Sequence, residues 1–348
     1  MTRTCIGWDV GGAHLKAVLL NMDGQVLAAT QVYCPLWRGL SELEIAIDKV
    51  LQEFNADQHA VTMTGELADI FANRRDGVMQ IASTLAEKLN GEIRYYTGRV
   101  GFVNKDAVEE RWLDIASMNW LASVQYAARK APKALFVDIG STTTDIALID
   151  NASPQIKGFT DATRMQCDEL VYTGVVRTPL MAMAQKIPFA GQMTNVAAEY
   201  FATAADVYTL TGDLEPAENM AETADGADKT IEACACRIAR MIGCDAADAP
   251  LASWVELANS FKSMQLEQIR QALLKKMFLL KDCQGLQLIG AGVGAFLVAE
   301  LAVQLDLEYH PVSEFITGFD KDARDMAAVC FPANAAAYLS VKDSGVFA

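Results

Sequence analysis

Basic residues are scarce in this sequence relative to acidic ones. The chain has 29 Lys and Arg against 44 Asp and Glu, which gives a formal net charge of −15. The basic residues are scattered and form no stripe, so the composition argues against nucleic acid as a partner. Because the overall field repels anions, a phosphate-bearing ligand has to be bound by local N–H groups, a few Lys or Arg, or a divalent cation.

Long apolar runs are also missing. The sequence has no stretch of eighteen or more uncharged apolar residues, and its first residues, Met-Thr-Arg-Thr, lead directly into an apolar, β-prone pattern. We therefore expect neither a membrane span nor a signal peptide. These absences predict a cytoplasmic protein without a membrane partner.

The cysteines lack the spacing of a disulfide framework. Most of the eight cysteines lie inside apolar segments, which is typical of a protein from a reducing compartment. Cys234, Cys236 and Cys244 do not predict a zinc site, because helical positions two apart point to different sides and no fourth ligand is near. We expect these three side chains to be small core residues.

Apolar material is plentiful. Hydrophobic residues make up 52% of the 348 positions, which is enough for two packed domains. We expect two similar α/β domains around a central cleft, over residues 1–131 and 132–321, with a C-terminal helix in residues 322–348 packing back toward the first domain. A helix is predicted over about 195–210, followed by a mobile polar loop at 212–228.

One local pattern occurs twice. Residues 9–16 read Asp-Val-Gly-Gly-Ala-His-Leu-Lys, residues 138–145 read Asp-Ile-Gly-Ser-Thr-Thr-Thr-Asp, and each stretch lies between two apolar runs. Each predicts a β-hairpin whose tight turn of small residues is entered through an aspartate. Because such a turn presents backbone N–H groups to an anion, the repeat predicts two related half-sites for one phosphorylated ligand.

A third glycine-rich turn occurs later in the chain. The apolar run 286–289 leads into Gly290-Ala-Gly292-Val-Gly294 and then into a helix pattern of small and apolar residues. A strand, glycine turn and helix in this order form a third candidate ligand contact, through Gly290 and Gly292. The same glycines can instead allow close packing of the helix on the strand.

Roles follow from the residue types in the two hairpins. Lys16 can reach a phosphate oxygen as a point charge, and Asp9 and Asp138 are candidate carboxylates for a hard cation such as Mg²⁺. Asp138 is also the candidate general base, and Asp145 is a further candidate metal ligand. Each aspartate can instead cap its own turn, and Lys16 can be a solvated strand residue. The candidate phosphate-binding residues are Gly11, Gly12, Ala13, His14, Gly140, Ser141, Thr142 and Thr143.

The segment 164–179 is the next candidate for a functional role. Arg164, Glu169, Tyr172 and Arg177 combine charge and aromatic character in a region with little regular pattern, where substrate-binding loops tend to occur. We expect these four residues to contact the substrate, although an ion pair at the surface also explains Arg177.

The order of these turns resembles a known superfold. Two aspartate-glycine hairpins followed by a glycine-rich strand-to-helix turn are similar to the phosphate-1, phosphate-2 and adenosine motifs of actin, sugar kinases and heat-shock ATPases. This resemblance implies the actin-like ATPase (ribonuclease H-like) α/β fold. Within that superfold, residues 138–145 resemble the hydantoinase A and 5-oxoprolinase branch most closely.

Further segments resemble a small family from methanogens and methylotrophic bacteria, and this resemblance covers nearly the whole chain. The family is described as a tetrahydromethanopterin-linked one-carbon-pathway protein, and its archaeal members as an aminomethylfuran synthase of methanofuran biosynthesis. It implies a transferase that joins a furan-methyl diphosphate to the phenol of glutamyl-tyramine and releases pyrophosphate, with Mg²⁺ stabilising the leaving group. The segments are 63–69, 138–145, 169–174, 177–179 and 201–208.

The first turn departs from the hydantoinase A pattern. Ala13, His14 and Lys16 stand where those relatives have Thr and a later Asp. This departure disfavours an ATP-driven hydantoinase and favours a basic site suited to a diphosphate. Two alternative functions remain open. The first is an ATP-dependent kinase or hydantoinase-type enzyme, and the second is a non-catalytic nucleotide-binding module. The sequence also leaves open whether the protein forms a homodimer.

Overall fold

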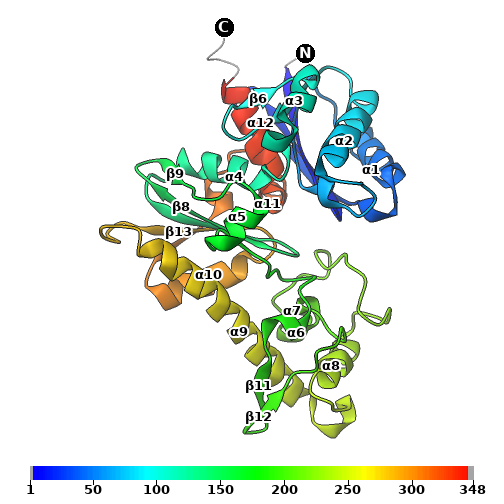
Figure 1. The fold of residues 1–348 in the computed structure, drawn as a ribbon, viewed down its shortest axis with the longest axis vertical. Helices are drawn as coiled ribbons and strands as arrows, with labels where there is room; N and C mark the ends of the chain where they lie inside the picture. Colours follow the sequence, from blue (N-terminus) through cyan, green and yellow to red (C-terminus); the bar gives the residue numbers. More distant parts are fainter. Residues whose placement is uncertain (1–2, 344–348) are drawn as a thin grey trace. The chain divides into compact units, whose positions relative to one another are not determined.

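A computed structural model describes residues 3–343 of the chain (Figure 1). The described residues divide into two compact units. The first comprises residues 3–132, 149–154 and 312–343, and the second comprises 133–148 and 155–311. The first unit is therefore discontinuous in sequence, and each unit is described by itself.

The first unit is built on a mixed sheet. Three antiparallel strands are followed by β4, which is parallel to β1, by β5, which is parallel to β4, and by a short antiparallel edge strand. The order is β3 (Val26–Tyr33), β2 (His14–Asn21), β1 (Thr4–Val10), β4 (Gln58–Met63), β5 (Glu92–Tyr96) and β6 (Phe102–Val103). Because β1 pairs with both β2 and β4, the end of β1 meets the first turn and the loop after β4 at one edge of the sheet.

Helices pack against this sheet. Ile6, Trp8 and Val10 of β1 belong to the same apolar core as residues of α1 and α2, while Gly7 contacts Ala333 and Ala337 of α12. Alternation along the strand therefore places Asp9 on the face that bears α12. The helices of this unit are α1 (Leu40–Glu53), α2 (Arg74–Lys88), α3 (Val108–Ile115), α4 (Asn119–Ala128), α11 (Lys321–Val329) and α12 (Phe331–Asp343).

The main sheet of the second unit repeats this order. Its third, second, first, fourth and fifth strands along the chain lie side by side, with β9 (Ser153–Gln155) paired off the main path to β8. The strands are β10 (Leu170–Val171), β8 (Thr144–Asp150), β7 (Ala134–Ile139), β13 (Gln287–Ala291) and β14 (Glu308–Pro311). The second aspartate turn therefore connects the two strands that correspond to β1 and β2.

The remainder of the second unit is mainly helical. A single apolar core joins β7, β8 and β13 to the buried faces of α7, α8, α9 and α10. The helices are α5 (Asp161–Gln166), α6 (Leu180–Met183), α7 (Ala204–Thr211), α8 (Ile231–Arg240), α9 (Leu251–Met277) and α10 (Ala295–Leu305), and a hairpin is formed by β11 (Lys186–Phe189) and β12 (Gln192–Asn195).

Two helix predictions were wrong in their bounds. The predicted helix over 195–210 begins only at Ala204, because Thr203 and Asp206 form a capping box that fixes its start. The C-terminal helix predicted in residues 322–348 is two helices, α11 and α12, with Cys330 between them, and positions 344–348 of that prediction lie outside the described residues. Pro332 in the first turn of α12 suits a helix start, where its missing N–H costs no hydrogen bond.

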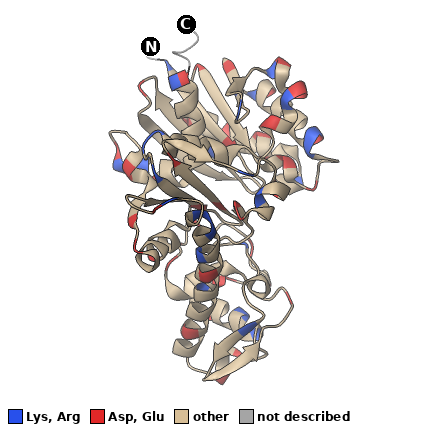
Figure 2. Cartoon of the chain, turned by 60° about the vertical axis from the view of Figure 1, so that its left-hand side comes forward, with Lys and Arg blue, Asp and Glu red and all other residues tan. Residues whose placement is uncertain are grey.

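Charge is dispersed over the fold. Figure 2 shows basic and acidic residues interspersed along the ribbon, in keeping with the scattered basic residues of the sequence. Among residues 3–343, no helix combines the length and the apolar character that crossing a membrane requires.

Candidate functional site

The first aspartate turn is closed and supported by backbone hydrogen bonds. The amide of Gly11 donates to the carbonyl of His14 across the turn (3.0 Å). Outside the turn, the amide of Leu36 donates to the carbonyl of Gly12 (3.0 Å) and that of Cys34 donates to the carbonyl of Ala13 (2.9 Å). The segment after β3 therefore fixes the orientation of two peptide groups in the turn.

This orientation decides where the neighbouring N–H groups point. In a trans peptide the carbonyl and the following N–H point in opposite directions, so the Ala13 amide points away from the segment that holds the Gly12 carbonyl. Within residues 3–343, the amides of Gly12 and Ala13 donate to no protein acceptor. Two consecutive N–H groups of this kind can bind an anion.

The second aspartate turn has the same construction in the other unit. The amide of Gly140 donates to the carbonyl of Thr143 (2.8 Å), and the amide of Val175 donates to the carbonyl of Gly140 (3.1 Å). The carbonyl of Ser141 accepts from Val176 (3.1 Å) and Arg177 (2.8 Å). The supporting segment again follows the third strand of its sheet.

The amides of this second turn are likewise directed away from their support. Because the carbonyls of Gly140 and Ser141 point toward the supporting segment, the next N–H groups, those of Ser141 and Thr142, point away from it. Neither amide has a protein acceptor in the part of the chain that the structure describes. Each unit therefore carries a turn that offers two consecutive backbone donors.

The glycine-rich turn after β13 lies directly against the second aspartate. A methyl group on Gly292 would clash with Oδ1 of Asp138 and with the carbonyl of Ile139, and Gly292 also has a positive φ of 77°. The amide of Gly294 donates to the carbonyl of Ile139 (2.9 Å). The structure thus brings Gly292 to the second turn, whereas Gly290 lies against the ring of Tyr309.

Asp9 and Lys16 are neighbours on paired strands of the first unit. Asp9 is 5% exposed, and its Oδ1 accepts from Nδ2 of Asn119 at 3.4 Å. The Nζ of Lys16 donates to the carbonyl of Val329 (3.1 Å) at the end of α11, a favourable place for a cation because a helix C-terminus is partially negative. His14 in the same turn packs edge to face against Tyr33.

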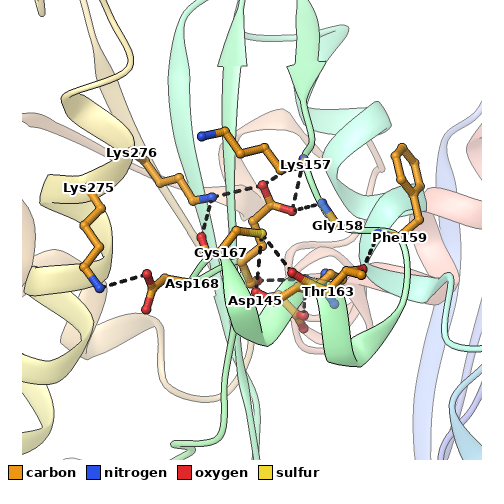
Figure 3. Close-up of polar contacts among 11 residues, drawn as sticks. Asp145, Lys157, Gly158, Phe159, Thr163, Cys167, Asp168, Lys275 and Lys276 are labelled. Carbon is orange, nitrogen blue, oxygen red and sulfur yellow. Dashed lines mark hydrogen bonds and ion pairs between the residues drawn. The ribbon is translucent and has the colours of Figure 1, made fainter.

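Asp145, the predicted third metal ligand, lies in a buried ion-pair network (Figure 3). Its Oδ1 accepts from the guanidinium of Arg164 at 2.8 Å. Burial raises the pKa of the Asp145 carboxyl, and Arg164 opposes this shift. The Arg164 guanidinium also donates to the carbonyl of Glu169 (2.8 Å).

Glu169 forms the second half of this network. Its carboxylate accepts from Nζ of Lys276 (2.9 Å) and from the amides of Lys157 (3.0 Å) and Gly158 (2.9 Å). Arg164 is 2% exposed and Glu169 is 1% exposed. The structure therefore gives these two predicted substrate-binding residues a packing role beside the hairpin and leaves them little surface for a substrate.

The other two predicted substrate residues remain at the surface. Tyr172 is 52% exposed, and the exposed Arg177 contributes its amide to the support of the second turn. No group of three or more His, Cys, Asp or Glu within residues 3–343 forms a metal-binding cluster. A divalent cation would thus have to be held by one or two carboxylates together with ligand oxygens and water, as Mg²⁺ commonly is.

Sequence reasoning missed the residues that support the turns. Gln265 contacts the segment behind the second turn from a position far along the chain, and Tyr208 in turn contacts Gln265. The one local signal was Gly174, whose added Cβ would lie 2.5 Å from the backbone of Ser141 and Thr142. A glycine in an otherwise apolar stretch is a known sign of close backbone approach.

This chain is similar in sequence to known proteins. The family model described as Hydantoinase/oxoprolinase matches residues 57–316. A synthase of Methanocaldococcus jannaschii, named (4-{4-[2-(gamma-L-glutamylamino)ethyl]phenoxymethyl}furan-2-yl)methanamine synthase, is 31% identical over 269 residues, which cover 76% of this chain and 79% of that protein. A protein of the same name from Methanococcus vannielii is 40% identical over 98 residues, covering 27% of this chain and 43% of its own length.

A solved structure shares the fold. The nucleotide-free structure of acetone carboxylase, from work on ATP-dependent acetone carboxylation, aligns with a TM-score of 0.56 at 11% identity, covering 97% of this chain and 70% of that one. At this identity the likeness concerns the fold alone.

Proposed function

This chain belongs to the hydantoinase/oxoprolinase family and has the actin-like ATPase fold, and from that premise we propose that it is a transferase of methanofuran-type carrier biosynthesis. In the proposed reaction, a furan-methyl diphosphate is joined to the phenol of glutamyl-tyramine. The methylene carbon forms a bond to the phenolic oxygen, the bond from that carbon to the diphosphate oxygen breaks, and the phenolic proton passes to a base. Pyrophosphate leaves with the bonding electron pair.

The name of the methanogen relatives supports this reaction. It describes a phenoxymethyl group between a glutamylaminoethyl-substituted ring and a furan bearing a methanamine. An aryl ether of this kind is the product expected when a phenol attacks a furan-methyl carbon. The M. jannaschii synthase aligns over 76% of this chain, a span that includes more than one segment of the candidate site.

The observation that carries the proposal is the pair of consecutive amides in the second turn, those of Ser141 and Thr142. They have no protein acceptor within residues 3–343, and they lie three and four positions after Asp138. Backbone donors held in this way stabilise charge that develops on a leaving group without reorganising during the reaction. The amides of Gly12 and Ala13 offer the same donors in the first unit.

Asp138 is the proposed general base for the phenol, and Asp9 and Lys16 are the other proposed catalytic residues. Mg²⁺ is the proposed cofactor, because it is commonly bound by one or two carboxylates together with substrate phosphates. Asp138, Asp9 and Asp145 are the candidate carboxylates, of which one or two would hold the ion together with substrate oxygens and water. When bound, Mg²⁺ would neutralise charge on the diphosphate.

The direct test is a coupling assay. The chain is incubated with furan-methyl diphosphate, glutamyl-tyramine and MgCl₂, and the ether product and pyrophosphate are measured by mass spectrometry and a pyrophosphate assay. We expect both products only when both organic substrates are present. ATP with either substrate alone should give no phosphate release. Absence of the ether under every metal condition, or phosphate release from ATP, would contradict the proposal.

Replacing Asp138 by Asn tests the proposed base. We expect turnover to fall by about 10²–10⁴-fold, the usual contribution of a general base, while binding of pyrophosphate measured by calorimetry persists. Asp168→Asn is a matched control, since Asp168 lies at the surface in an ion pair with Lys275 and has a positive φ that Asn also tolerates. Equal turnover of the two variants would remove Asp138 from the proposed mechanism.

A further inference from the structure

The second turn is supported by a segment that we call the strap, Thr173–Thr178. Amides of the strap bind the carbonyls of Gly140 and Ser141, and the hydroxyl of Thr144 donates to the carbonyl of Thr173 (2.6 Å). The strap also closes on itself, because the amide of Gly174 donates to the hydroxyl of Thr178 (2.7 Å). Any movement of the strap therefore changes the direction of the turn's peptide groups.

The strap is itself held by one side chain from a distant helix. Gln265 lies in the middle of α9 and is completely buried. Its Nε2 donates to the hydroxyl of Thr173 (2.8 Å) and to the carbonyl of Gly174 (3.0 Å). Gly174 packs so tightly on the turn that an added Cβ would lie 2.5 Å from the backbone of Ser141 and Thr142. Gln265 therefore acts on a part of the strap that touches the turn.

Tyr208 of α7 fixes the orientation of this amide. Its hydroxyl donates to Oε1 of Gln265, which leaves Nε2 facing the strap. Burial raises the pKa of Tyr208, so the hydroxyl stays protonated and remains a donor. Buried polar groups that are fully paired in this way specify one arrangement, because any other arrangement leaves a donor or acceptor without a partner.

The first turn is supported by a different kind of packing. Its supporting residues, Cys34 and Leu36, are buried members of the apolar core of the first unit. Apolar packing of this kind is non-directional, whereas the bonds of Gln265 fix the strap at specific atoms. Support by buried polar side chains, those of Gln265 and Tyr208, is therefore described for the second turn, which is the turn that carries the proposed base.

We infer that Gln265 and Tyr208 are positioning residues for diphosphate binding at the second turn. This inference rests on the proposed function. Neither side chain touches substrate, and both act through the strap, which sets the direction of the Ser141 and Thr142 amides. Loss of either side chain weakens the hold on the diphosphate and leaves the phenol acceptor unaffected.

Two substitutions test this inference. Tyr208→Phe removes only the hydroxyl, and Gln265→Met keeps the length of the side chain but removes its donors. Gln271→Met is the matched control on the same helix, because the Gln271 side chain is exposed and its one hydrogen bond among residues 3–343 is with Glu267. All three variants are first compared with the unchanged chain by thermal unfolding, so that kinetic changes can be separated from loss of folded protein.

Two measurements are then made on the folded variants. In steady-state kinetics, Tyr208→Phe and Gln265→Met should each raise the KM for the diphosphate substrate by about two- to tenfold, which is the change in affinity expected when one hydrogen bond is lost. The KM for the phenol should not change. A purely structural defect would lower kcat and leave both KM values unchanged. In hydrogen exchange, the amides of Val175, Val176 and Arg177 should exchange faster, because the turn carbonyls protect them.

The outcomes distinguish the two hypotheses. Unchanged exchange in the strap together with an unchanged KM for the diphosphate overturns the positioning role and leaves the proposed function standing. A different result would be faster exchange of the strap amides in the variants, while the unchanged chain neither binds pyrophosphate nor forms the ether. This result overturns the proposed function but keeps the role of Gln265 and Tyr208 in holding the strap. Gln271→Met should match the unchanged chain in both measurements, and a shift there as large as that of Gln265→Met also overturns the inference.

Discussion

Gly174 is the residue on which the second turn most directly depends. A methyl group there would lie 2.5 Å from Thr142 N and from the carbonyl carbon of Ser141, which are backbone atoms that cannot rotate aside. We expect Gly174→Ala to lower the free energy of unfolding by about 1–3 kcal/mol, as overpacking does elsewhere, and to abolish pyrophosphate binding. Urea unfolding and calorimetry measure the two effects.

The control for this substitution lies in the first turn. A Cβ on Gly12 would meet no atom within 4 Å, and its φ is not positive. Gly12→Ala should therefore unfold at the same urea concentration as the unchanged chain. If Gly174→Ala were equally stable, the close contact between strap and turn would not exist in solution.

Single residues also show where sequence reasoning succeeds and where it stops. The glycines and aspartates of the two turns are adjacent in sequence, so their hairpins could be predicted from local pattern. Arg164 and Glu169 looked like substrate residues because their types and loop position suit that role, but burial cannot be read from residue type. Gln265 gave no signal, since its partners Thr173 and Gly174 lie 92 and 91 positions away.

At the scale of elements, α9 is tied to the hairpin region at two places. Gln265 anchors the strap near the middle of the helix, and Lys276 at its end pairs with Glu169 and donates to the carbonyl of Cys167 (2.9 Å; Figure 3). The side chains of Lys276 and Glu169 are 3% and 1% exposed. A pair this deeply buried leaves an uncompensated charge when one partner is removed.

This contrast predicts unequal effects of two neighbouring substitutions. Lys276→Met should destabilise the chain by about 3–5 kcal/mol, the usual cost of breaking a buried ion pair. Lys275→Met should cost about 0–1 kcal/mol, because the Lys275 side chain is 61% exposed and its pair with Asp168 lies at the surface. Urea unfolding of the two variants compares them, and equal losses would show that the buried pair is solvated.

Element boundaries were predictable only where the chain marks them locally. The start of α7 is marked by the capping box of Thr203 and Asp206, but the helical pattern predicted upstream of it depended on apolar residues that instead pack as irregular chain. The break at Cys330 between α11 and α12 is marked by Pro332, because a proline removes a hydrogen bond from a helix interior but suits the first turn of a new helix. The prediction of one continuous helix overlooked this local signal.

At the scale of the whole molecule, the net charge of −15 repels the proposed anionic substrate. The proposed donors are neutral backbone amides in both turns, so the acidic field opposes the approach of pyrophosphate over long range while the bound anion is held at short range. Salt screens the long-range part. Between ionic strengths of about 0.01 M and 0.1 M, the Debye length falls from about 30 Å to about 10 Å.

We therefore expect the association rate of magnesium pyrophosphate to rise as salt increases over this interval, with the dissociation rate nearly constant. A site built on a basic patch would show the opposite sign, because salt would screen its attraction. Stopped-flow measurement of the association rate at several KCl concentrations decides between the two. Lys16→Met is the informative variant, since it removes the one basic side chain among the proposed catalytic residues. If binding slowed with salt in the unchanged chain but not in that variant, local attraction by Lys16 would outweigh the acidic field.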